Sequence, residues 1–130
     1  MKYIIDTYAW IEYLNASRTG EKVKQIVDDA NNELITHIVS IAELASALKR
    51  RTNEEKVAAS INIINSLSQI KNIDFNSALK TGELHAEMRK AQKDFGMADA
   101  FILQTARETG AKIVTGDEHF RKIKEAILIR

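Results

Sequence analysis

The chain has 130 residues, of which 45% are hydrophobic and 28% charged, and its formal net charge is +1. This length and composition are those of one globular domain, so we expect a single domain over residues 1–130. The near-neutral charge gives no sign of nucleic-acid binding by itself. Cysteine is absent, which excludes disulfides, thiolate zinc sites and cysteine nucleophiles.

The first residues predict a short strand that ends at an acid, and not a signal peptide. No stretch reaches the ~20 consecutive apolar residues that a membrane span needs. We therefore expect a cytoplasmic protein with no membrane partner.

Short apolar runs alternate with amphipathic stretches along the whole chain. Strands are expected at residues 3–5, 34–39, 70–75, 112–115 and 126–129. Helices are expected directly after Asp6-Thr7, over residues 21–31, from Ser40 to about 51, over 54–68 and 76–93, and around Asp99 up to Gly110. This alternation predicts parallel crossover units, and so a three-layer α/β/α sandwich around a parallel sheet of four to five short strands.

Acidic residues lie where the predicted strands end. Asp6 directly follows the first strand, and Asp117 follows the strand at 112–115. Glu43 and Asp99 lie near the starts of predicted helices. Because ligands of parallel α/β folds bind at the carboxyl ends of the strands, we expect these four acids to meet at one edge of the sheet.

Each acid also has a purely structural explanation. Asp6 and Asp117 could cap the helices that follow them, because aspartate is a preferred N-cap residue. Asp99 could compensate the helix dipole, although it lies on the apolar face of its helix. Glu43 could be an exposed surface residue, as most helical glutamates are.

Four acids aimed at one crevice favour a shared function over four separate structural roles. Carboxylates in close proximity raise each other's pKa unless cations lie between them. Oxygen ligands without cysteine or a histidine cluster suit Mg²⁺ or Mn²⁺ better than zinc. The sequence thus predicts a metal site, and carboxylate-held divalent ions support phosphodiester hydrolysis.

Four segments of the sequence resemble the PIN-domain nucleases and, more narrowly, the VapC-type toxins of toxin–antitoxin pairs. Asp6 lies in IIDTYAWIEYL and Glu43 in VSIAELASAL. Asp99 lies in MADAFILQTARETG and Asp117 in IVTGDEHF. The DA-x-I-x-x-x-A and TGDEHF blocks are the most specific parts, and the resemblance is weak only over residues 53–93.

The resemblance implies an Mg²⁺- or Mn²⁺-dependent endoribonuclease, the toxin of a type II toxin–antitoxin system, that hydrolyses RNA with an activated water. Asp6 and Asp99 would be the principal metal ligands, and Glu43 and Asp117 would complete the catalytic, metal-binding cluster. Family members usually form homodimers, and a cognate antitoxin inhibits them by placing its tail in the site. Hydroxyls that could add a ligand or orient a water are those of Thr7, Ser40 and Thr115.

Other features carry weaker predictions. The basic residues 49–51 and those at 89, 90 and 93 could contact an RNA backbone or be solvated helix faces. His119, the only histidine near the site, is interpreted mainly as a surface residue at a helix start, with contact to the substrate as the alternative. The helix at 54–68 has more apolar residues than one packing face needs, which predicts a protein interface unless neighbouring helices cover them.

Two other functions fit parts of the pattern. A receiver-like phosphoacceptor domain would need paired acids after the first strand, where this sequence has Asp6 alone. A non-catalytic PIN-like module would bind RNA or protein without cutting, and its binding would survive loss of the acids.

Overall fold

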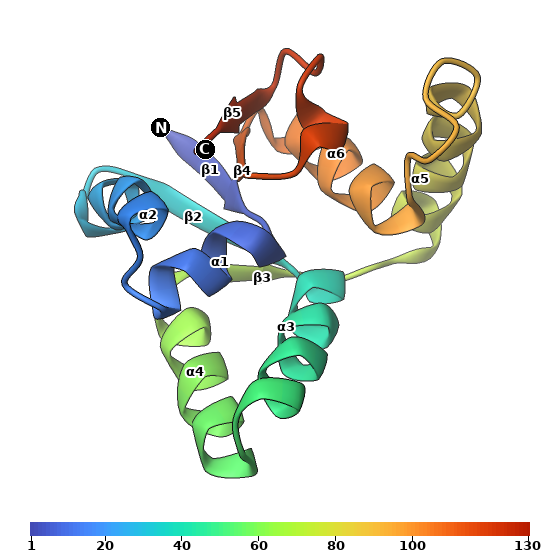
Figure 1. Ribbon diagram of the computed structural model, residues 1–130. Coiled ribbons are helices and arrows are strands. Elements are labelled where there is room, and N and C mark those ends of the chain that lie inside the picture. Colours follow the sequence, from blue (N-terminus) through green and yellow to red (C-terminus); the bar gives the residue numbers. More distant parts are fainter.

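A computed structural model describes residues 1–130 and shows a five-stranded parallel sheet between two layers of helices (Figure 1). In chain order the strands are β1 (Lys2–Ile5), β2 (Glu33–His37), β3 (Gln69–Lys71), β4 (Lys112–Thr115) and β5 (Ala126–Leu128). The helices are α1 (Thr7–Leu14), α2 (Arg18–Asp28), α3 (Ile38–Arg51), α4 (Glu54–Leu67), α5 (Phe75–Met88) and α6 (Met97–Thr109), with a 3-10 turn η1 (Glu118–Phe120). The predicted α/β/α sandwich is confirmed.

Successive residues of β1 point into different layers, as a strand buried on both faces requires. Ile4 packs with Phe95 and Leu103 in the core under α5 and α6. Ile5 packs with Trp10 and Leu44 in the core under α1 to α4. Two hydrophobic cores thus hold the central strand from opposite sides.

The sheet order β3-β2-β1-β4-β5 contains one reversal of direction. The chain runs outward from β1 to β2 and β3, and then crosses back to β4 and β5 on the other side of β1. The reversal lies between β1 and β4, which pair in parallel with Ile5 opposite Val114. Open α/β sheets leave a crevice at the carboxyl ends of such strands. Asp6 and Asp117, which follow these two strands, border that crevice.

Two helices begin earlier than predicted, because N-cap residues start them before the predicted positions. Helix α2 begins three residues before the predicted range 21–31, because the Ser17 hydroxyl accepts a backbone hydrogen bond in the first turn. Helix α3 begins before Ser40, because the His37 imidazole caps it by accepting a backbone hydrogen bond. Histidine is not a usual N-cap residue, so no familiar capping signal marks the start of α3.

The third strand is also shorter than the predicted range 70–75. Asp74 and Ser77 form a reciprocal capping box, which starts α5 at Phe75. The helix ends at Met88 and not near residue 93.

Exposed apolar side chains lie mainly on α5 and less on α4. Ile64 of α4 is buried, and Ile63 and Leu67 are 45% and 37% exposed. Phe75 and Leu79, one turn apart on α5, are 87% and 55% exposed. The apolar surplus predicted on α4 is therefore partly covered within the chain. No helix combines the length and the apolar character that a membrane crossing requires.

Candidate metal centre

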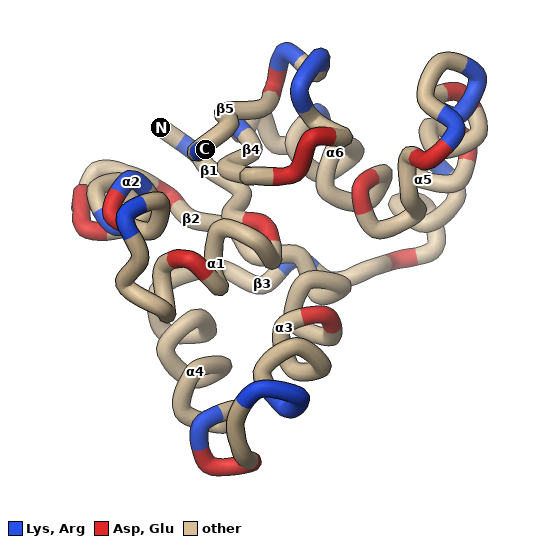
Figure 2. The backbone as a smooth tube through the Cα atoms, in the orientation of Figure 1, with Lys and Arg blue, Asp and Glu red and all other residues tan.

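All four predicted acids line one cavity at the reversal of the sheet. Its volume of about 270 Å³ leaves room for an ion with several waters. The acids come from four separate parts of the chain: Asp6 precedes α1, Glu43 is on α3, Asp99 is in the first turn of α6 and Asp117 follows β4. Figure 2 shows these acidic segments around the centre of the molecule.

Asp6 combines a capping role with a place in the cavity. Its Oδ1 accepts a hydrogen bond from the Ala9 amide at 2.9 Å, so the structural explanation of this acid is correct as far as it goes. Burial nevertheless raises the pKa of Asp6 to about 7, although the Thr115 hydroxyl and the Ala9 amide lower it. The negative charges of Asp117 and Glu43 raise it further. The ionised carboxylate is therefore costly until a cation approaches it.

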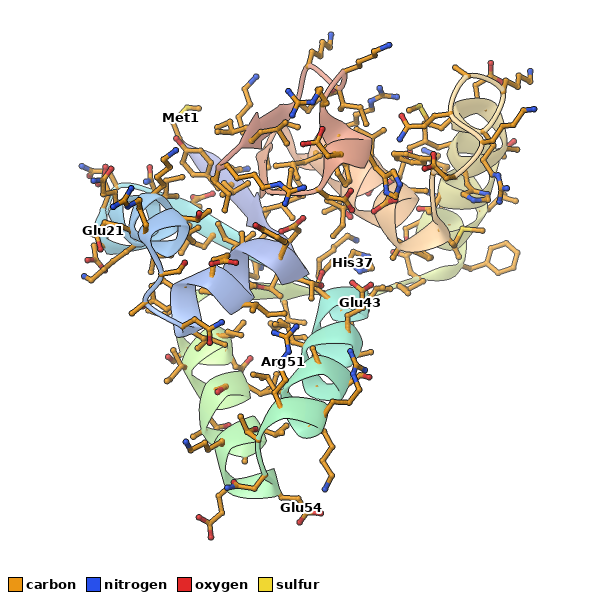
Figure 3. The ribbon with its side chains drawn as sticks, in the orientation of Figure 1. Met1, Glu21, His37, Glu43, Arg51 and Glu54 are labelled. Atoms are coloured by element: carbon orange, nitrogen blue, oxygen red, sulfur yellow. The ribbon has the colours of Figure 1, made fainter.

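Glu43 is held at the cavity by a hydrogen bond between two helices. The Thr7 hydroxyl of α1 donates to Glu43 Oε1 at 2.7 Å. The Glu43 side chain leaves α3 near its first turn, toward the space between α1 and α6 (Figure 3). Ser40, one turn earlier and 1% exposed, also lines the cavity, and its Oγ has no hydrogen-bond partner.

Asp99 is the first-turn acid of α6 and faces the cavity from the opposite side. Its Oδ2 accepts a hydrogen bond from the Gly96 amide at 3.0 Å, at the position where that helix begins. Partial burial raises the pKa of Asp99, and the charge of Asp117 adds to this effect. The Gly96 hydrogen bond and His119 act in the opposite direction.

Asp117 is fixed by the tight turn after β4. Its amide donates to Thr115 Oγ1 at 2.9 Å, and its Oδ1 accepts from the His119 amide at 2.9 Å. Gly116 is needed at this turn because a Cβ there would lie 2.1 Å from Cε1 of Tyr8. The ring of Tyr8 thereby fits the start of α1 closely against the turn that carries Asp117.

Asp94 was not among the predicted site residues, and His119 was predicted mainly as a surface residue. The His119 ring is 34% exposed and lies among Asp94, Asp99 and Asp117, so its assignment to the surface is corrected. Burial lowers the pKa of His119, but the surrounding carboxylates outweigh burial and raise it overall. The TGDEHF segment did place His119 two residues after Asp117, whereas nothing in the sequence marked Asp94.

The donor set fits a divalent cation. Carboxylate and hydroxyl oxygens are the ligands that Mg²⁺ and Mn²⁺ prefer. The buried Ser40 hydroxyl has no hydrogen-bond partner, and the charge of the buried Asp6 carboxylate is offset by no basic side chain. An ion with its waters in the cavity would satisfy both.

Known structures share the fold over nearly their full length. The VapBC complex of Salmonella typhimurium bound to DNA contains a chain with a TM-score of 0.78 and 19% identity, covering 100% of this chain and 99% of the other. VapBC2 of Rickettsia felis, bound to a promoter DNA fragment, gives a TM-score of 0.75 at 20% identity, with 98% and 97% covered. VapC20 of Mycobacterium tuberculosis, a toxin that cleaves the sarcin-ricin loop, gives 0.75 at 15% identity, with 94% and 95% covered.

Comparison at the sequence level gives a consistent result. No curated protein matches the chain significantly. The profile of the family described as PIN domain matches residues 3–126, which is nearly the whole sequence. The chain therefore belongs to the PIN-domain family.

Proposed function

We propose that this protein is a metal-dependent endoribonuclease and the toxin of a toxin–antitoxin pair. The observation that carries the proposal is the convergence of four carboxylates on one cavity at the reversal of the sheet. Membership of the PIN-domain family supports it, as does the similar fold of a chain in a toxin–antitoxin complex from Klebsiella pneumoniae.

In this proposal each of the four acids has a role that follows from its position in the cavity. Asp6 and Asp99, on opposite sides of the cavity, bind Mg²⁺ or Mn²⁺, and Glu43 and Asp117 complete the ligand set. A divalent ion supplies the Lewis acidity and phosphate neutralisation that phosphodiester hydrolysis requires. The hydrogen bond from the Thr7 hydroxyl to Glu43 Oε1 would orient this carboxylate toward the ion.

The basic residues that remain unpaired suit contact with an RNA backbone. Of the predicted basic residues, Lys49 and Lys90 form ion pairs with neighbouring acids, whereas Arg50, Arg51, Arg89 and Lys93 form none. These four cations lie at the end of α3 and just after α5, at different ends of the molecule (Figure 2). Phosphate contacts from both ends would fit a structured RNA that spans the cavity.

Two apolar surfaces suit the proposed protein partners. The exposed apolar pair Phe75 and Leu79 on α5 is a surface that two copies can bury in a homodimer. Next to the half-exposed Ile63 of α4 lies a hollow that Tyr13 and Leu14 also line, which suits an inserted side chain of an antitoxin. A toxin that acts on RNA under antitoxin control would work in the cytoplasm.

The test is cleavage of a labelled pool of structured RNA by protein freed of antitoxin. Wild type should cut with Mg²⁺ or Mn²⁺ and stop with EDTA. Asp99→Asn should reduce cutting by at least about 100-fold, because it removes a ligand charge. Asp28→Asn, an exposed aspartate on α2, is the matched control and should cut normally.

Two results would contradict the nuclease. Cutting that is equal in Asp99→Asn and wild type would show a contaminating nuclease. RNA binding without cutting in either metal, unchanged in Asp99→Asn, would favour the non-catalytic binding module.

A further inference from the structure

His119 lies at the meeting point of three carboxylates that come from different segments. Its Nε2 is 3.0 Å from Asp94 Oδ2, in the loop before α6. Its Nδ1 is 3.3 Å from Asp99 Oδ2 and 3.2 Å from Asp117 Oδ1. The two ring nitrogens therefore have different surroundings, one facing a single carboxylate and the other facing two.

The nitrogen between two carboxylates makes no hydrogen bond. Nδ1 of His119 is buried and has no hydrogen-bond partner, although both oxygens are close enough to accept one. A proton on Nδ1 would point at an acceptor if the ring were simply paired with Asp99 or Asp117. Instead Nδ1 lies close to both oxygens and makes a hydrogen bond with neither.

This arrangement is that of neighbouring ligands around an ion. With bonds of about 2.1 Å, adjacent ligands lie about 3.0 Å apart in octahedral and about 3.4 Å apart in tetrahedral coordination. The distances from Nδ1 to Asp99 and Asp117 fall between these values. One atom from each of Asp99, Asp117 and His119 lies within 4.8 Å of the other two.

Asp94 gives the ring the orientation that a metal ligand needs. Histidine ligands almost always donate their second N–H to a carboxylate or carbonyl, which fixes the tautomer and leaves the other nitrogen free for the metal. Asp94 Oδ2 is placed to accept from Nε2, which leaves the lone pair on Nδ1. The backbone at this point is also held, because Gln92 Nε2 donates to the His119 carbonyl at 3.0 Å.

The cavity that Asp99 and Asp117 line contains a second buried polar group without a hydrogen-bond partner. The Ser40 hydroxyl is buried, lines the cavity with Asp99 and Asp117, and has no hydrogen-bond partner. Polar groups that are this deeply buried are normally satisfied by protein, water or an ion. Two buried, unsatisfied polar atoms, Ser40 Oγ and His119 Nδ1, thus lie on elements that border one group of carboxylates.

We propose that His119 Nδ1 binds a divalent metal together with Asp99 and Asp117, and that Asp94 positions the imidazole for this role. The inference rests on the metal centre of the proposed function and adds to it a nitrogen ligand. Imidazole favours transition metals over Mg²⁺, whereas carboxylates alone bind Mg²⁺ and Mn²⁺ alike. The centre should therefore prefer Mn²⁺ to Mg²⁺, and His119 should be the source of that preference.

The experiment is calorimetric titration of metal-free protein with MnCl₂ and, separately, with MgCl₂. In His119→Gln, Mn²⁺ affinity should fall at least about tenfold, and Mg²⁺ affinity should change far less. His119→Asn keeps an oxygen near the position of Nδ1, so it should retain more Mn²⁺ affinity than His119→Gln. His85→Gln removes a histidine of α5 outside the cavity and should match wild type.

Asp94→Asn tests the positioning role without removing the ligand. It should weaken Mn²⁺ binding about tenfold, as loss of the partner of a histidine ligand usually does, and leave the melting temperature of the metal-free protein nearly unchanged. If His119→Gln does not fold, the Mn²⁺ affinity of Asp94→Asn still tests whether the His119 imidazole binds the metal.

The possible outcomes separate this inference from the proposed function. Equal Mn²⁺ affinity in wild type and His119→Gln, or equal losses for both metals, would overturn the role of His119 and leave the carboxylate centre standing. Tighter Mn²⁺ binding in His119→Gln would show that the imidazole is only a counter-charge. No binding of either metal by wild type would overturn the metal centre itself.

Discussion

The cavity has two walls that hold their carboxylates by different means. The first wall, from β1, α1 and α3, carries Asp6 and Glu43, and its polar contacts are hydrogen bonds to a backbone amide and a hydroxyl. The second wall, from α6 and the turn after β4, carries Asp99 and Asp117, and the His119 imidazole lies between them. The first wall therefore has no basic side chain, whereas the second has one.

This difference shows which wall carries most of the free-energy cost of placing four ionisable carboxyl groups close together in the folded protein. Burial raises the pKa of Asp6 to about 7, and no basic side chain offsets it. The pKa of Asp99 is also raised by burial, but His119 acts against the rise. We infer that the metal-free protein is destabilised mainly by its first wall at neutral pH, and that a bound cation relieves the first wall most.

The largest expected effect on stability comes from the close contact between Tyr8 of the first wall and Gly116 of the second wall. Gly116→Ala would place a Cβ against the Tyr8 ring, so the ring or the turn carrying Asp117 must shift. We expect the free energy of unfolding to fall by about 2–3 kcal/mol, measured by urea denaturation.

Gly82→Ala is the matched control for this prediction. A Cβ at Gly82, inside α5, meets no atom within 4 Å. Alanine should stabilise that helix by about 0.5–1 kcal/mol. Equal changes in the free energy of unfolding for the two substitutions would show that the Tyr8 ring does not pack closely against Gly116.

The second-largest expected effect is on the pH dependence of stability, and it tests the cost of the buried Asp6 charge in the first wall. Asp6→Asn keeps an N-cap oxygen for the Ala9 amide but removes the buried charge. Because the folded pKa of Asp6 lies above its unfolded value, stability in the metal-free wild type is lost as pH rises from about 4 to about 7. The variant should therefore match wild type near pH 4 and be more stable at pH 8 by about 1–2 kcal/mol.

The same measurement on the second wall sharpens the comparison. Asp99→Asn should give a smaller gain at pH 8, because it also removes an attraction to His119. Equal gains for Asp6→Asn and Asp99→Asn would mean that the imidazole offsets nothing and that the two walls do not differ electrostatically.

The smallest effect concerns the hydroxyl that holds Glu43. Thr7→Val removes the hydrogen bond to Glu43 Oε1 and keeps the shape of the side chain. Thr7 and Glu43 are not deeply buried, so we expect less than about 1 kcal/mol of lost stability. Mg²⁺ affinity should fall about tenfold, as it does when a metal ligand loses its orienting partner. Unchanged affinity by calorimetry would remove Thr7 from the site.

Much of the fold could be predicted because its signals are local. The strand at Lys112–Thr115 and the glycine stop at Gly110 follow from a β-branched run and a left-handed C-cap, and the structure has both. The start of α3 could not be predicted, because His37 caps it with an imidazole. The Asp74–Ser77 capping box starts helix α5 one residue before the predicted position, and the helix ends at Met88, before the predicted end near residue 93.

The site could be predicted only where the strand ends determine it. Asp6 and Asp117 follow β1 and β4 directly, so the sheet order alone brings them to one crevice. The approach of Asp94 to His119 depends on the path of the loop before α6, which no short-range pattern encodes. The fit of Tyr8 against Gly116 likewise appears only when both walls are in place.

The most direct test of the metal centre is a crystal of wild type soaked in MnCl₂ and measured for anomalous scattering. We predict a manganese peak within the cavity, bound by the carboxylates of Asp6, Glu43, Asp99 and Asp117. A peak absent from crystals of Asp6→Asn treated in the same way would strengthen the assignment. An empty cavity in fully soaked wild-type crystals, or manganese bound only elsewhere, would contradict it.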